Sequence, residues 1–245
     1  YFGIVLGPQC HYGMIINCSA TDGADVGMLC SDISGSPTGE AASFNQFIGC
    51  TSAYNYDFDS ALFGNPPGSS ADGYENEGVE NHYIDCSAYA NSDDGFDMYR
   101  GMNSNLYHCK AFYSGRTEPV YQGARNRSAE KALVGNPTVQ GDGMNVKLGS
   151  GNGIRTDTVA DGGANSKVIG CLSAYARMMG YTNNQSLEMT LVHCTGIGNL
   201  NRNFFSDKSP FGAEKILVQN CLSYAGGTID TLYGNSTQNT NSWNL

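Results

Sequence analysis

The hydrophobic positions of this chain fall in short clusters, each built around a cysteine, a small residue and, in most clusters, an aromatic residue. The clusters end at Thr21, Tyr54, Tyr89, Phe112, Tyr175, Ile197 and Tyr224. These end positions are separated by 33, 35, 23, 63, 22 and 27 residues. The short steps indicate a repeat of about 22–23 residues. The steps of 33 and 35 fit one repeat with a longer loop, and the step of 63 fits two repeats plus an insertion.

A repeat of this length predicts an all-β solenoid, in which each repeat forms one coil of a parallel β-helix. It is too short for a propeller blade and lacks the leucines of a leucine-rich repeat. The small residue of each cluster would form a ladder on one face of the solenoid. This predicted ladder contains Ala20, Ala53, Ala88, Ala111, Ala174, Gly196 and Ser223.

The composition agrees with short strands and turns rather than long helices. Gly accounts for 32 of the 245 residues, and charged residues for only 15%. We expect one β-helix domain over residues 1–245, trimmed at one or both ends, with a polar loop insertion at residues 118–140. No apolar run is long enough for a membrane span.

The net charge of -10 is unevenly distributed along the chain. Residues 1–99 contain 14 acidic residues and no Lys or Arg, whereas eight of the 13 basic residues lie between Arg100 and Arg155. So acidic a protein is a poor candidate for binding nucleic acid. A basic band beside an acidic region favours an acidic ligand that is bridged by a metal ion.

Seven of the nine cysteines belong to the repeated clusters. Disulfides, a metal site or a column of buried thiols could explain them, and the buried thiols are favoured. The total is odd, and the sequence contains no Cys-x-x-Cys pair. His108 and His193 each precede a cysteine directly, and adjacent strand residues point to opposite faces, so zinc binding is disfavoured.

Four aspartates in two short segments are candidate metal ligands. Asp72 lies 21 residues before Asp93, so a coil of that length would stack it beside Asp93 and Asp94. Asp97 follows in the same segment, and Gly95 would permit a turn that aims both neighbouring carboxylates at one ion. Ca²⁺ prefers such oxygen ligands, although Asp-Asp-Gly is also a common turn sequence.

Lys147 is a candidate general base. It stands between Val146 and Leu148 in a short segment bounded by glycines, so it should point away from the core. A solvated lysine is the simpler interpretation. A nearby cation and partial burial would instead lower its pKa and make the neutral amine available.

Three motifs of this sequence resemble polysaccharide lyase family 9, the pectate lyase-like right-handed β-helices. They are Ala-Asp72-Gly-Tyr, Asn-Ser-Asp93-Asp94-Gly-Phe-Asp97 and Asp-Gly-Met-Asn-Val-Lys147-Leu-Gly. The resemblance runs from about residue 48 to the end of the chain. The second and third motifs together are fairly specific, whereas each alone would be weak.

The resemblance implies a secreted, calcium-dependent lyase that cleaves an acidic polysaccharide of the pectate type by β-elimination. It assigns Ca²⁺ to Asp72, Asp93, Asp94 and Asp97, and the role of base to Lys147. Arg100, Arg116 and Arg155 are candidates for binding substrate carboxylates, with surface salt bridges as the alternative.

Two departures from the family pattern leave other functions open. Glu75, Glu77 and Glu80 add negative charge after Asp72, and the insertion before Lys147 is long. A structural or adhesive solenoid could have kept the lyase scaffold, with end-to-end self-association through its exposed sheet edges. A third interpretation is a protein that binds polysaccharide through calcium without cleaving it.

Overall fold

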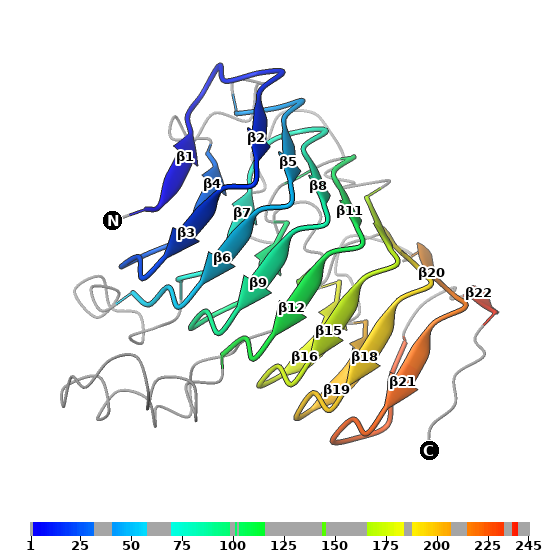
Figure 1. Cartoon of the computed structure of the whole chain (residues 1–245). Coiled ribbons are helices and arrows are strands. Elements are labelled where there is room, and N and C mark those ends of the chain that lie inside the picture. Colours follow the sequence, from blue (N-terminus) through cyan, green and yellow to red (C-terminus); the bar gives the residue numbers. More distant parts are fainter. Residues whose placement is uncertain are drawn as a thin grey trace, which may run out of the picture.

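Short parallel strands wind into a solenoid of three sheets (Figure 1). The computed structural model describes residues 2–31, 41–57, 70–98, 101, 103–115, 144–145, 166–183, 188–206, 215–232 and 237–239. Over these residues every strand pairing is parallel, and the structure contains strands and turns but no helix. The prediction of an all-β parallel solenoid is therefore confirmed.

The sheets are numbered here in the order in which the chain visits them. Sheet 1 contains β1 (Ile4–Leu6), β4 (Met28–Cys30), β7 (Tyr74–Asn76), β10 (Phe96–Asp97), β13 (Met144–Asn145), β16 (Met179–Thr182) and β19 (Arg202–Phe205). Sheet 2 contains β2 (Met14–Ile16), β5 (Gln46–Ile48), β8 (His82–Ile84), β11 (Asn105–Tyr107), β14 (Lys167–Ile169), β17 (Glu188–Val192), β20 (Lys215–Gln219) and β22 (Thr237–Asn239). Sheet 3 contains β3 (Ser19–Thr21), β6 (Thr51–Ala53), β9 (Ser87–Tyr89), β12 (Lys110–Phe112), β15 (Leu172–Ala174), β18 (Thr195–Ile197) and β21 (Leu222–Tyr224).

The predicted count of coils was wrong at the longest step of the repeat. β12 pairs directly with β15, so Phe112 and Ala174 lie on adjacent coils. The step of 63 residues is therefore a single coil with a large insertion rather than two coils. The steps of 33 and 35 residues are single coils, as expected, because β6 pairs with both β3 and β9.

The cysteines set the register of sheet 3, and the predicted ladder of small residues needs correction. Each strand of this sheet begins directly after a cysteine, and Ala20 pairs with Ser52, which in turn pairs with Ala88. Ser52 and Ser173 therefore replace Ala53 and Ala174 in the ladder. The aromatic residues on which the alignment rested lie at the ends of the strands or one residue beyond.

The residue before each cysteine of these repeats makes a sharp corner between sheets 2 and 3. All seven such residues have a positive φ, between 52° and 65°. Gly adopts this conformation freely, and Asn, Asp and His adopt it more readily than most residues. This explains why the corner residues are Asn17, Gly49, Asp85, His108, Gly170, His193 and Asn220.

Aromatic stacks and a column of thiols fill the interior of the solenoid. Ring pairs stack from one coil to the next, as in Tyr74 on Phe96, whose ring centroids lie 4.5 Å apart. Of the nine free cysteines, seven are buried, and Cys10 and Cys18 are the exposed and partly buried exceptions. The predicted column of buried thiols is confirmed for Cys50, Cys86, Cys109, Cys171, Cys194 and Cys221.

The thiols also contribute hydrogen bonds between coils. Cys86 Sγ, for example, donates to the carbonyl oxygen of Phe47 on the preceding coil, at 3.3 Å. No helix among the described residues has the length and hydrophobicity that crossing a membrane requires.

Candidate metal centre

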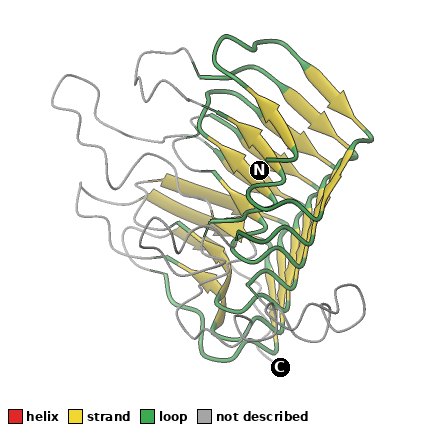
Figure 2. Ribbon diagram, turned by 90° about the vertical axis from the view of Figure 1, so that its left-hand side faces the viewer, coloured by secondary structure: helices red, strands yellow, loops and turns green. Residues whose placement is uncertain are grey.

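The candidate metal centre lies on the connections that lead from sheet 3 into sheet 1 (Figures 1 and 2). Tyr74 of β7 pairs with Phe96 of β10, and this register places Asp72 beside Asp94 on neighbouring coils. The sequence spacing therefore predicted the stacking of these segments correctly.

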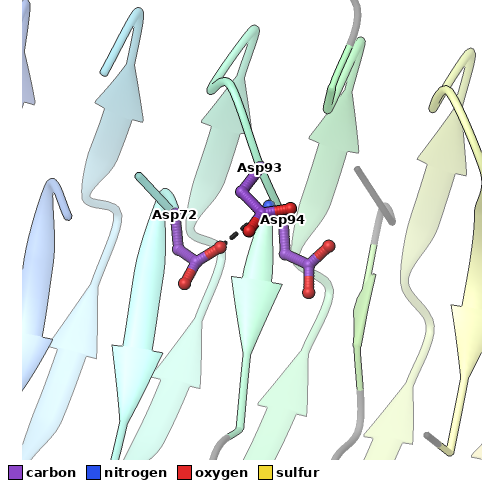
Figure 3. Close-up of side chains that lie close together, drawn as sticks. All are labelled: Asp72, Asp93 and Asp94. Carbon is purple, nitrogen blue, oxygen red and sulfur yellow. Dashed lines mark hydrogen bonds between the residues drawn. The ribbon is translucent and has the colours of Figure 1, made fainter. Parts of the chain in front are cut away.

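Three carboxylates converge at this point (Figure 3). One side-chain oxygen from each of Asp72, Asp93 and Asp94 lies within 4.8 Å of the other two. The backbone N–H of Asp94 donates to Oδ1 of Asp72 at 2.8 Å, which fixes one coil against the next. Asp72 and Asp94 are each only 6% exposed, and Asp93 is half-buried.

A bend at Ser92 and Asp93 brings the two consecutive carboxylates to the same side of the chain. Gly95, which was expected to supply this turn through a left-handed conformation, is not among the residues with positive φ. Its carbonyl instead accepts a hydrogen bond from Tyr74, at 3.0 Å. The absence of side chains is needed at the paired residue Gly73, where a Cβ would lie 2.5 Å from that carbonyl oxygen.

A buried asparagine holds the bend in place, and the sequence analysis did not single it out. Asn91 lies two residues before Asp93, and its Oδ1 accepts hydrogen bonds from the backbone N–H and Nδ2 of Asn55, at 3.2 and 2.8 Å. Its Nδ2 donates to the carbonyl of Ser52 at 3.2 Å. Two asparagines that follow the aromatic of consecutive repeats are the signal that could have revealed this ladder.

The electrostatics of the cluster disfavour the charged form of its most buried member. The pKa of Asp72 lies well above its ordinary value, first because of burial and then because of the carboxylates of Asp93, Asp94, Asp97 and Glu75. A bound cation would reverse this effect, since an opposite charge nearby favours the carboxylate.

Asp97 was predicted as a fourth ligand, but it stands apart from the three convergent carboxylates. It lies in β10, where it pairs with Glu75 of β7 and Asn145 of β13. Its charge contributes to the raised pKa of Asp72, so it belongs to the same acidic surface. It is not part of the set whose ligand atoms all lie within 4.8 Å.

The residues at this centre fit a hard divalent cation such as Ca²⁺. All three convergent side chains offer carboxylate oxygens, which Ca²⁺ prefers, and none offers the nitrogen or sulfur that a softer metal favours. This cluster is the one group of three or more potential metal-binding side chains within the described part of the chain. Zinc coordination by the cysteines finds no support there, since His108 is exposed while Cys109 is buried.

Several predicted site residues lie outside the described residues. These are Lys147, Arg100, Arg116 and Arg155, together with the predicted loop insertion at residues 118–140. The nearest described segment before Lys147 is β13, which ends at Asn145.

A second buried acid on the same turn was not predicted. Asp57 follows Asn55 by two residues, as Asp93 follows Asn91, and it is 3% exposed. Burial raises its pKa from 3.8 to about 6, and the carboxylate of Asp25 adds to the effect.

Comparison with known proteins agrees with this architecture. A model of the family "Pel9A-like, right handed beta helix region" matches residues 3–220. The chain covers 94% of its own length when superposed on a solved pectate lyase, "Crystal structure of pectate lyase Pel9A", with a TM-score of 0.55 and 18% identity. Pectate lyase L from Thermoclostridium stercorarium is 32% identical over 103 residues, which are 40% of this chain and 8% of that protein.

The fold is therefore a right-handed parallel β-helix, and this chain belongs to the Pel9A-like β-helix family. It spans about half of the solved relative, 48% of that chain, and a much smaller part of Pectate lyase L. The predicted resemblance to the pectate lyase-like β-helices is confirmed.

Proposed function

We propose that this protein is a calcium-dependent polysaccharide lyase that cleaves a uronic acid polymer by β-elimination. The observation that carries the proposal is the convergence of Asp72, Asp93 and Asp94 within 4.8 Å, in a chain of the Pel9A-like family. The names of two relatives, both pectate lyases, support an acidic polysaccharide as the substrate. We further expect the protein to act outside the cell, where such polymers occur.

Asp72, Asp93 and Asp94 would hold the calcium ion, with Asp97 as a fourth carboxylate on the same surface. When bound, calcium would withdraw charge from a substrate carboxylate and so make the neighbouring C5 proton more acidic. The carboxylates alone would repel a polyanion, which explains why such an acidic surface needs the cation to bind this substrate.

Lys147 is the proposed base. It follows Asn145 by two positions, and alternate residues of an extended strand share a face. Asn145 pairs with Asp97, so this face is the acidic one. The neutral amine of Lys147 would take the C5 proton, the electron pair would form the C4–C5 double bond, and the 4-linked oxygen would leave and take up a proton.

Arg100, Arg116 and Arg155 are proposed to bind further carboxylates of the polymer. A guanidinium group binds a carboxylate through two parallel hydrogen bonds, which suits a repeating uronate. The overall acidity of the chain makes such local positive charge necessary for an anionic substrate.

The test is the ultraviolet absorbance of unsaturated uronides, recorded on a panel of uronic acid polymers with calcium or with chelator. Lys147→Ala should lower the rate by about 10²–10⁴-fold, the usual contribution of a general base. Lys167→Ala, at an exposed lysine of β14, is the matched control and should leave the rate unchanged.

Activity that survives the chelator or the loss of Lys147 would contradict the proposal. Polymer binding that requires calcium but gives no unsaturated product would instead favour the non-catalytic polysaccharide-binding protein.

A further inference from the structure

A row of tyrosines runs along the outside of the solenoid, beside the candidate metal centre but separate from it. Tyr89 ends β9, and Tyr54, Tyr113 and Tyr175 each follow the last residue of β6, β12 and β15 directly. These strands are consecutive in sheet 3, which faces the viewer in Figure 1, so the tyrosine row crosses four adjacent coils.

The rings of the tyrosine row contact one another from coil to coil. The ring centroids of Tyr54 and Tyr89 lie 5.5 Å apart, and those of Tyr89 and Tyr113 lie 5.6 Å apart, with the planes at 71° and 74°. Tyr113 and Tyr175 stack at 5.3 Å with an angle of 17°. An edge-to-face contact covers a face of only one of its two rings, so the row is not a closed stack.

The tyrosines are not explained by the backbone or by the core. Tyr54, Tyr113 and Tyr175 have φ values of 58°, 58° and 60°, a conformation that favours Gly, Asn or Asp over a bulky residue. Tyr175 is 39% exposed, and the other three are partly exposed. Their side chains therefore meet solvent, where a row of large rings on a monomeric surface is unusual.

The charge of this face sets it apart from the rest of an acidic protein. The described strands of sheet 3 contain no Asp or Glu, and Lys110 is their only charged residue. Lys110 is exposed and alternates with the buried Ala111, so it lies on the outer face together with Phe112, which borders the row. A chain with a net charge of -10 thus presents here a surface that does not repel an anion.

The row also adjoins the candidate metal centre. Only the buried residues Ala90, Asn91 and Ser92 separate Tyr89 from Asp93 along the chain. Neighbouring coils are about 4.8 Å apart, so four rings provide a linear series of contacts rather than a single pocket.

We propose that the tyrosine row and Lys110 bind sugar units of an anionic polysaccharide, in a site separate from the carboxylate cluster. This inference rests on the proposed function for the identity of the polymer. Tyrosine suits the ligand because its ring packs against the apolar C–H face of a pyranose while its hydroxyl stays hydrogen-bonded. The polymer's carboxylates meet Lys110 and no acid on this face, and its linear form matches the linear row.

The proposal is tested by the retention of the protein in gels that contain polygalacturonate. Chelator in the gel keeps binding apart from calcium-dependent cleavage. The variant Tyr113→Ala/Tyr175→Ala should bind about tenfold more weakly, since each aromatic contact contributes about twofold to tenfold. Tyr107→Ala, at a partly exposed tyrosine of β11 in sheet 2, is the matched control and should bind like the original protein.

A second variant does not disturb the packing of rings. Lys110→Glu reverses the charge at an exposed position, so it should fold normally and bind several-fold more weakly, with the deficit shrinking at high salt. Cleavage assays with calcium add a further readout, in which the double tyrosine variant should raise KM for long polymer while kcat stays unchanged.

The outcomes separate this inference from the proposed function. Retention that both the tyrosine and the Lys110 variants leave unchanged, or no retention of the original protein in chelator, would overturn the tyrosine-row site, whether or not cleavage occurs. Tyrosine-dependent retention without any unsaturated product would support the site and overturn the lyase.

Discussion

At the scale of single residues, the account depends on buried carboxyl groups whose charge is unfavourable without a cation. Asp72 and Asp57 both have raised pKa values, and burial is the first cause for each. They differ in surroundings. Asp72 lies in the convergent cluster, whereas Asp57 lies on another coil and takes no part in the proposed calcium site.

The pH dependence of stability should show the buried charge of Asp57. Its pKa is about 6 in the folded protein, against an ordinary value of 3.8. Between about pH 4 and pH 6 the folded chain keeps a proton that the unfolded chain has lost, so rising pH removes stability. Asp57→Asn should abolish this loss, up to about 3 kcal/mol, in urea unfolding measured across the window.

The matched control is Asp85→Asn, at a carboxyl that is 65% exposed on the corner between sheets 2 and 3. It should leave the pH profile of stability almost unchanged. A profile that Asp57→Asn does not alter would contradict the burial argument.

At the scale of the elements, the corner between sheets 3 and 1 depends on small residues that let neighbouring coils approach. A Cβ at Gly73 would lie 2.5 Å from the carbonyl oxygen of Gly95, 2.7 Å from Nδ2 of Asn91 and 3.0 Å from Cβ of Ala88. Two of these contacts involve residues on the segment that carries Asp93 and Asp94.

Gly73→Ala should therefore destabilise the protein by about 1–3 kcal/mol, the usual cost of overpacking. It should also weaken calcium binding, because it separates Asp72 from the Asp93–Asp94 segment. Gly7→Ala is the control, since a Cβ there would meet nothing within 4 Å. Urea unfolding and calcium titration of both variants check the prediction, and equal stability for the two would refute it.

The sequence predicted the elements well because solenoid repeats carry the same residues to the same place in every coil. The cysteines, the corner residues and the paired aspartate segments all follow the register. It could not predict which coils receive insertions, since loop length adds little to the energy of closing a coil. The step at Phe112 was miscounted for this reason.

The alignment was wrong where an aromatic residue was trusted over a buried one. Tyr54 and Tyr175 lie one residue beyond their strands, at the surface, where a shift of one position is tolerated. The cysteine before each strand is buried and hydrogen-bonded to the preceding coil, so its position is fixed by packing.

At the scale of the whole molecule, the column of thiols makes cysteine reactivity a test of the coil count and of the buried register. Seven of the nine cysteines are buried, and burial raises the pKa of Cys30 to about 12. Thiolates, not thiols, react with disulfide reagents. The folded protein should therefore react quickly only at Cys10 and, more slowly, at Cys18.

A thiol titration before and after denaturation checks this expectation. The denatured chain should show all nine thiols, as expected for a protein whose cysteines are all free. Rapid reaction of more than two thiols in the folded state would contradict the buried column, and fewer than nine after denaturation would indicate disulfides.

The most direct measurement of the central claim is a calorimetric titration of the calcium-free protein with Ca²⁺. We expect one site, and Asp94→Asn should weaken it by about tenfold or more, because the change removes a charged ligand but keeps the backbone hydrogen bond to Asp72. Asp85→Asn should bind calcium like the original protein. A protein that binds no calcium, or an Asp94→Asn variant that binds it unchanged, would contradict the assignment of this centre.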